Sequence, residues 1–248
     1  MGKLPAITFS FWVMKICATT LGETAGDLLS MTLNIGYGVS SVILLSFFLA
    51  TLVTQLATKK YHPVIYWAVI LSTSTAGTTL SDYMDRTLGL GYATGSLILV
   101  SLLAITLFTW RATEKSLSVT NIRTLRGEIF YWTAILFSNT LGTALGDFLA
   151  DDSGLGFGGG ALLIGSLLLV ITLCYYFTKM SHVILFWMAF VLTRPFGATF
   201  GDLLTKSTEK GGLNFGTIGS SAILFLILAV LIAVTTKKIN SSRRAEVS

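Results

Sequence analysis

The stretch Thr20-Leu-Gly-Glu-Thr-Ala-Gly-Asp27 is written four times in this chain, each time in a slightly different form. The other copies are Thr75-Ala-Gly-Thr-Thr-Leu-Ser-Asp82, Thr140-Leu-Gly-Thr-Ala-Leu-Gly-Asp147 and Pro195-Phe-Gly-Ala-Thr-Phe-Gly-Asp202. Fifteen residues before each aspartate stands a tryptophan that follows another aromatic residue: Trp12, Trp67, Trp132 and Trp187. Internal repeats set the architecture of a chain, so we interpret the sequence as one helical unit used four times.

The repeats are nested. The two halves of the chain match at an offset of 120 residues, as in Trp12 and Trp132 or Asp27 and Asp147, and the two units within each half are offset by 55 residues. We therefore predict two halves, 1–115 and 116–248, each with two repeats and four transmembrane helices. A polar loop at 111–127 separates them.

The composition excludes an ordinary soluble protein. Hydrophobic residues make up 53% of the chain, charged residues 12%, and the mean hydropathy is +0.76. A bilayer-spanning helix needs about 20 apolar residues. Runs of that length predict an all-α protein with eight transmembrane helices, at 7–29, 35–57, 63–83, 89–110, 128–150, 157–178, 182–204 and 216–236.

The distribution of positive charge predicts the orientation and argues against nucleic-acid binding. Three basic residues fall on the connectors after the odd helices, namely Arg86, Lys206 and Lys210. Twelve fall at the termini and on the other connectors: Lys3, Lys59, Lys60, Arg111, Lys115, Arg123, Arg126, Lys179, Lys237, Lys238, Arg243 and Arg244. By the positive-inside rule both termini are expected in the cytoplasm, and the aspartates near the outer face.

Two glycine patterns carry structural expectations. Small residues four apart, as in Gly22 and Gly26, let helices approach closely in lipid, and each copy has such a pair. Because every repeat has an even number of helices, the four repeats are parallel, with pseudo-symmetry about the membrane normal. The string Gly36-Tyr-Gly38 resembles a channel filter, but we expect only a close turn there, because nine residues after Asp27 leave no room for a pore helix.

The acidic residues are the candidate site. A carboxylate within the bilayer costs on the order of 3 kcal/mol, so repeated intramembrane acids mark functional sites, although solvated helix ends are an alternative. Lys15 is expected to snorkel toward the cytoplasm, whereas Arg194 is expected to pair with a carboxylate, either as a fixed bridge or as a gate. The predicted ion-binding residues are Glu23, Asp27, Asp82, Asp147, Asp202, Arg194 and Asn139, and the carboxylates among them are the predicted metal ligands.

The ligand chemistry favours hard cations. Carboxylate, hydroxyl and carbonyl oxygens suit Mg²⁺, Ca²⁺ or Mn²⁺ better than Zn²⁺ or Cu⁺. Many of the neighbouring Ser and Thr hydroxyls are expected to bond to their own helix carbonyls. His62 and His182 stand at the opposite ends of their helices from the acids. We find no catalytic constellation and no paired cysteines, and we expect neither enzymatic activity nor a resident cofactor.

With the repeats aligned, the chain resembles a family of bacterial uncharacterised membrane-anchored proteins built from four short repeats of unknown function. The matching residues are Gly26-Asp27, Ser81-Asp82, Gly146-Asp147 and Gly201-Asp202 with the tryptophans before them, and Ser81 departs from the Gly-Asp form. The resemblance implies a location in the bacterial inner membrane. It implies no activity.

These observations predict a transporter or channel for a hard divalent cation, with Mn²⁺ or Mg²⁺ ahead of Ca²⁺. The expected partners are the lipid bilayer and the cation, without nucleic acid and with a homo-oligomer left open. Two alternatives stand beside it: a pathway for monovalent cations or protons, and a membrane scaffold that transports nothing.

Overall fold

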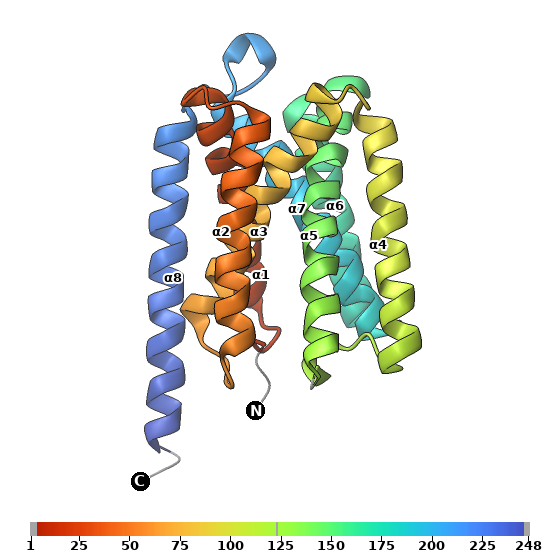
Figure 1. Cartoon of the computed structure of the whole chain (residues 1–248), viewed down its shortest axis with the longest axis vertical. Coiled ribbons are helices and arrows are strands. Elements are labelled where there is room, and N and C mark those ends of the chain that lie inside the picture. The colour runs from red at the N-terminus through yellow and green to blue at the C-terminus, as the bar shows by residue number, and fades with distance from the viewer. Residues whose placement is uncertain (1–3, 123, 246–248) are drawn as a thin grey trace.

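The computed structural model describes residues 4–122 and 124–245, and these residues form helices and short connections without a strand. The expectation of an all-α chain with eight long helices is confirmed for the described residues (Figure 1). The long helices are α1 (Phe9–Asp27), α2 (Tyr37–Ala57), α3 (Pro63–Asp82), α4 (Tyr92–Glu114), α5 (Leu125–Asp147), α6 (Gly156–Phe177), α7 (His182–Thr205) and α8 (Thr217–Ala245). Five short elements join them: the π-helices η1 (Leu28–Thr32), η2 (Tyr83–Thr87) and η4 (Phe148–Asp152), and the 3-10 turns η3 (Val119–Asn121) and η5 (Thr208–Lys210).

Some boundaries differ from the predicted ones. The helix α4 runs on to Glu114 and α5 begins at Leu125, so the polar loop expected at 111–127 is shorter than predicted. The helix α8 continues past the apolar run, as far as Ala245. Hydropathy marks where apolar residues stop, whereas a helix in water can continue through polar residues.

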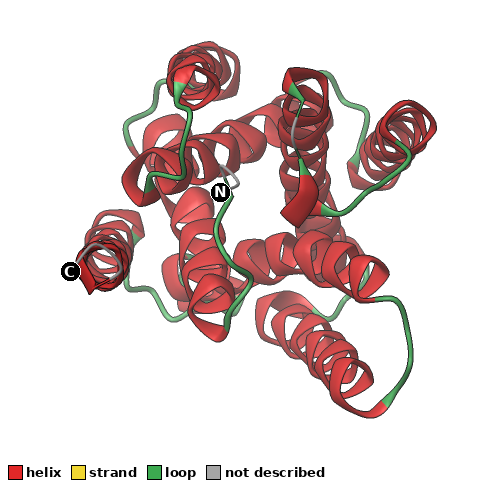
Figure 2. Cartoon of the chain, turned by 90° about the horizontal axis from the view of Figure 1, so that it is seen from below, coloured by secondary structure: helices red, strands yellow, loops and turns green. Residues whose placement is uncertain are grey.

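The four odd-numbered helices form a closed ring at the centre. α1 packs on α3, α3 on α5, α5 on α7, and α7 on α1 (Figure 2). We call the end of the bundle where the odd helices begin the lower end, and the end where they finish the upper end, as they stand in Figure 1.

The even-numbered helices lie outside the ring, and each packs on the inner helix of the following repeat. α2 packs on α3, α4 on α5 and α6 on α7, and α8 closes the circle by packing on α1. Each repeat therefore supplies the outer cover of its neighbour. A single repeat would therefore leave its own inner helix without an outer cover.

Glycines of the repeated motif hold the ring together. A Cβ atom added to Gly22 would lie 2.1 Å from the Ser74 hydroxyl, and one added to Gly197 would lie 2.6 Å from that of Thr19. Gly77 faces the Asn139 backbone in the same way, and Gly142 faces the Arg194 side chain. The predicted role of these glycines in close helix packing is confirmed.

Aromatic residues fill the lower end of the ring. The residue before each tryptophan contacts the tryptophan of the neighbouring helix: Phe11 with Trp67, Tyr66 with Trp132, Tyr131 with Trp187, and Phe186 with Trp12, at centroid distances of 5.6, 5.7, 6.5 and 5.8 Å. Eight aromatic rings thus close the lower end with buried apolar surface.

The exterior of the bundle suits lipid. Five helices are long and apolar enough to cross a membrane: α2, α4, α6, α7 and α8. Large apolar side chains on the outer helices, such as Val42, Phe108, Leu162 and Val230, are more than half exposed. The helices α1, α3 and α5 direct many Ser, Thr and charged residues into the ring, which lowers their hydropathy. The protein has the features of a membrane protein.

The Gly36-Tyr-Gly38 string is a turn, as expected. Gly36 precedes the first residue of α2 with φ of 83°, a conformation that residues with a Cβ atom seldom adopt, and Gly91 precedes α4 with φ of 72°. Both cysteines are free thiols, which agrees with the prediction of no disulfide.

Candidate cation-binding site

The four aspartates lie at the upper end, where the inner helices change geometry. Asp27, Asp82 and Asp147 are the last residues of α1, α3 and α5, and a π-helix begins at the next residue in each case. The fourth copy differs, because α7 continues past Asp202 to Thr205. Single π-turns inside helices often occur at functional sites because they redirect side chains and carbonyls.

All four aspartates point into the bundle and are almost fully buried, with exposed fractions of 2–4%. Glu23 lies one turn below Asp27 on α1 and is equally buried. We call these five residues, Glu23, Asp27, Asp82, Asp147 and Asp202, the acidic column. The alternative of solvated acids at helix ends is wrong for this structure.

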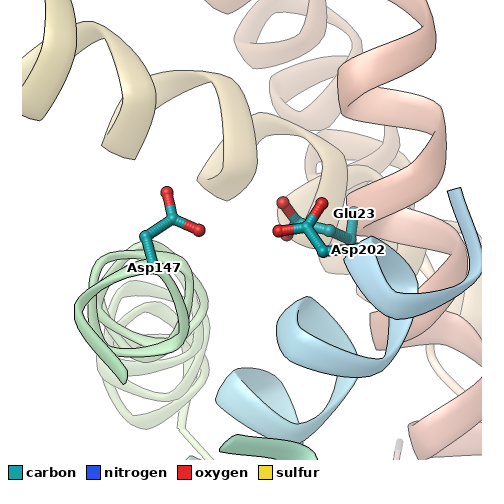
Figure 3. A group of neighbouring side chains, drawn as sticks. All are labelled: Glu23, Asp147 and Asp202. Atoms are coloured by element: carbon teal, nitrogen blue, oxygen red, sulfur yellow. The ribbon is translucent and has the colours of Figure 1, made fainter. Parts of the chain in front are cut away.

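Three members of the acidic column come closest together. One carboxylate oxygen each from Glu23, Asp147 and Asp202 lies within 4.8 Å of the other two. Figure 3 shows the Asp147 carboxylate on α5 directed toward those of Glu23 on α1 and Asp202 on α7. Residues from three different inner helices therefore converge on one point.

Two basic residues bridge the aspartates at the upper end. Arg86 Nε lies 2.8 Å from Asp82 Oδ1 and its Nη2 donates a 3.0 Å hydrogen bond to Asp147 Oδ2. Lys206 Nζ pairs with Asp27 Oδ2 and lies 3.1 Å from Asp202 Oδ1, close enough for an ion pair although not aligned as a hydrogen bond. Each of these two residues joins the aspartate four positions before it in the chain to the aspartate of the next repeat around the ring, where the first repeat follows the fourth. We call Arg86 and Lys206 the tether residues.

Both tether residues are held in the charged form but remain near the surface. Burial on its own would lower the pKa of Lys206, but the carboxylates of Asp202 and Asp27 outweigh it and raise that pKa above its usual value. The same balance, with Asp147 and Asp82, raises the pKa of Arg86. Their side chains are 19% and 36% exposed, in contrast to the buried aspartates. The tether residues are therefore the members of the site that solvent reaches most easily.

Below the aspartates, a second and fully buried ion pair crosses the ring. Arg194 on α7 donates from Nη2 to Glu23 Oε2 at 2.9 Å and to the hydroxyls of Thr78 and Thr143, both at 2.6 Å. Among the described residues its Nε and Nη1 atoms have no hydrogen-bond partner. The prediction that Arg194 pairs with a carboxylate is confirmed, and this one side chain touches the other three inner helices.

Glycines make room for this pair. A Cβ atom at Gly142 would lie 2.3 Å from Arg194 Cγ, and one at Gly201 would lie 3.0 Å from Glu23 Cβ. Both glycines belong to the repeated motif, so the packing motif and the charged residues occupy the same contact. Larger side chains would displace Arg194 and Glu23.

The expectation for Lys15 is wrong. Its side chain does not snorkel to the lower surface but is fully buried, with Nζ 4.0 Å from the centre of the Phe190 ring. Nζ also lies 3.5 Å from Asn139 Oδ1, while the Asn139 amide donates to Thr73 at 2.9 Å. Asn139, eight residues before Asp147, thus contacts Lys15 and Thr73 and lies outside the acidic column.

Most hydroxyls behave as expected of Ser and Thr in helices. Thr20, Thr75 and Thr140, for example, donate to carbonyls four residues earlier in their own helices. Thr78 and Thr143 are the exceptions, since their hydroxyls also donate toward Glu23 at 3.3 and 3.4 Å. They stand at the positions equivalent to Glu23 in the second and third repeats.

The tether residues were not predicted as part of the site. Both had been assigned to outer connectors by the charge distribution, but each stands four residues after an aspartate, Arg86 after Asp82 and Lys206 after Asp202. Ion pairs at that spacing are a standard feature of helices. With Arg194, they bring three basic groups to the five carboxylates.

Comparison with protein families gives one match. The family model described as Repeat of Unknown Function (DUF347) matches residues 10–61, 65–116, 130–181 and 185–238. Each matched segment comprises one inner helix and the outer helix that follows it. No curated protein and no solved structure matches the chain.

Proposed function

The chain belongs to the family of the Repeat of Unknown Function (DUF347), and from the geometry of its acidic column we propose that it transports a hard divalent cation across a membrane. The cation would bind between Glu23, Asp147 and Asp202. The tether residues would hold this site while the cation is absent. The family description carries no activity, so the proposal depends on the residues.

One observation carries the proposal: two singly charged side chains bridge the acids from the exposed end of the site. Together the five carboxylates and the three basic side chains that contact them, Arg86, Arg194 and Lys206, have a formal charge of minus two. If Arg86 and Lys206 swing outward, two positive charges leave, and one divalent cation restores the same balance. The exchange is electrically neutral, which avoids the large cost of an unbalanced buried charge.

The spacing of the oxygens sets the size of the ion. Ligands of Ca²⁺ lie at about 2.3–2.6 Å, so opposite ligands are about 4.6–5.2 Å apart, and the observed limit of 4.8 Å already fits. Mg²⁺ requires about 2.0–2.1 Å, so the three helices would have to close in by a few tenths of an ångström at each ligand. The spacing alone therefore favours Ca²⁺, and Mn²⁺ or Mg²⁺, which the sequence analysis places first, would bind only with this closure. Water would supply the remaining ligands.

The proposal includes a membrane arrangement. The inner helices have 19 to 24 residues, which at about 1.5 Å per residue is enough for the ~30 Å hydrocarbon core. We infer that all eight helices cross an inner membrane, with pseudo-symmetry about its normal. The basic residues of the lower end favour the cytoplasm there, so the acidic column would open to the outer side.

Uptake of Mn²⁺ into proteoliposomes tests the function. Wild type is expected to accelerate uptake, and Asp147→Asn is expected to reduce it by at least about tenfold, because one ligand and the Arg86 contact are lost. The matched control is Asp152→Asn, five residues later in an exposed position, which should behave as wild type. Uptake at the wild-type rate by folded Asp147→Asn, for Mn²⁺, Mg²⁺ and Ca²⁺ alike, would refute the proposal.

The same assay covers the alternatives. The formal charge of minus two would also fit two protons or two monovalent cations, and this reading predicts proton or K⁺ flux that Asp147→Asn abolishes. The observation that every aspartate of the column has a basic partner favours a scaffold, which predicts no flux of any cation. The three outcomes are distinct in one set of vesicles.

A further inference from the structure

A second feature of the molecule lies outside the ring, on the face formed by α2, α3 and α8. A groove of about 610 Å³ runs there, and almost all of its surface is apolar. Its walls are formed by Phe47 of α2 and Phe225 of α8, and Trp67 of α3 lies at its base. Three alanines, Ala68, Ala229 and Ala233, leave the hollow between the larger side chains.

We propose that this groove binds one acyl chain of an acidic phospholipid, with the headgroup held by Lys59, Lys60 and Lys237. The proposal concerns the lipid-facing side and does not depend on cation transport. It identifies a ligand class for a surface that the acidic column does not use.

The position of the groove matches one leaflet of a bilayer. Its lining on α8 runs from Phe225 to Thr236, a distance of eleven residue steps, which at about 1.5 Å per residue is roughly 16 Å. Half of the ~30 Å hydrocarbon core is about 15 Å. The groove reaches the lower end of the bundle, because it includes Val64 at the start of α3, and its lining on α8 is the middle of that helix.

Positive charge stands where the headgroup would lie. Lys237 directly follows the lining residue Thr236, and Lys60 precedes the lining residue Val64 by four positions. Lys59, Lys60 and Lys237 are exposed. Basic groups next to a membrane attract anionic headgroups by about 1 kcal/mol each in ordinary bilayers, which corresponds to about fivefold in affinity per lysine.

A second copy of the chain fits the groove less well. A transmembrane helix of a partner would need a contact surface along the whole ~30 Å core, and the groove covers about half of that length. A second copy would also bring no net negative charge to the three lysines, because the described chain is itself basic at this end. An acidic lipid provides both the apolar chain and the anionic head.

Native mass spectrometry of the full chain tests the proposal. The purified protein is incubated with equal amounts of phosphatidylglycerol and phosphatidylcholine that have the same acyl chains. Wild type is expected to retain one phosphatidylglycerol, with at least about tenfold preference. Replacement of Ala229 by Trp should remove most of the binding of both lipids, whereas Val230→Trp, next to it on the outward face of α8, should leave binding unchanged.

Two matched triple variants test whether the headgroup is recognised by its charge. The triple variant Lys59→Gln, Lys60→Gln, Lys237→Gln should retain lipid but lose the preference for phosphatidylglycerol. The control Arg111→Gln, Lys115→Gln, Lys179→Gln removes three exposed positive charges from the end of α4 and from the lower connectors, away from the groove, and its preference should persist. Equal binding of both lipids by wild type, or unchanged binding by Ala229→Trp, would overturn the proposal. A dimer that excludes lipid from this face would assign the groove to a second copy and overturn it as well.

Discussion

Two layers of the inner ring contain ion pairs and differ in their access to solvent. The upper layer consists of the four aspartates and the tether residues, and the middle layer of Glu23 and Arg194. In the upper layer Arg86 and Lys206 reach the aspartates from partly exposed positions, and each divides its contacts between two carboxylates. In the middle layer Arg194 is fully buried and binds one carboxylate together with two hydroxyls. Under the proposed function, the upper ion pairs are the exchangeable bridge and the Arg194 pair is the fixed one.

The buried pair should dominate stability. The Arg194→Met variant leaves Glu23 buried without its partner, and removal of one member of such a pair costs about 3–5 kcal/mol. Thermal or denaturant unfolding in detergent measures this loss. The double variant Glu23→Gln with Arg194→Met should recover part of it, since neither charge is then stranded.

Arg86→Met is the control from the upper layer. Its side chain is 36% exposed, and we expect a loss of about 1 kcal/mol. If the Arg194 and Arg86 variants lose equal stability, the distinction between a fixed and an exchangeable layer is wrong.

The next largest loss of stability is expected from substitution of the glycines beside the middle layer. Gly142→Ala would place a Cβ atom 2.3 Å from Arg194 Cγ, and overpacking of this kind costs about 1–3 kcal/mol. The control is Gly158→Ala in α6, where the nearest atom outside its own helix backbone would be 3.9 Å away and the substitution should be neutral or stabilising. Equal unfolding temperatures for the two variants would contradict the close contact.

How far the sequence predicted this structure depends on the scale. The four repeats, the helical class and the close contacts at Gly22 and Gly142 followed from residue type and spacing, because packing in lipid leaves few alternatives. The order of packing did not follow, since nothing in the repeat itself indicates that α2 packs on α3 and not on α1.

The site was predicted in part. The acids, Glu23 included, were identified because carboxylates within apolar runs are costly, and Arg194 for the same reason. Lys15 was misplaced because a lysine near a helix end can snorkel, and only the fold brings Phe190 and Asn139 to it. Arg86 and Lys206 were missed because the charge distribution assigned them to the outer connectors, although their spacing from Asp82 and Asp202 was visible.

Rescue of stability by the cation also distinguishes the two layers. Lys206→Gln should cost about 1–2 kcal/mol, between the values for exposed and buried pairs. If the cation replaces the tether residue, added Mn²⁺ at about 100 times its dissociation constant should add about 2.7 kcal/mol, which is enough to bring Lys206→Gln back to the stability of cation-free wild type. The same addition should leave Arg194→Met below that level, because about 2.7 kcal/mol does not cover a loss of about 3–5 kcal/mol. Rescue of both variants, or of neither, would remove the difference between the layers.

The most direct test is calorimetric titration of the purified protein with Mn²⁺. If the tether residues occupy the cation site, Lys206→Gln should bind Mn²⁺ about tenfold more tightly than wild type, a gain of about 1.4 kcal/mol. Lys210→Gln, an exposed lysine on the same connector, should bind as wild type does. Unchanged or weaker binding in Lys206→Gln would contradict the claim that this side chain and the cation compete for the same carboxylates.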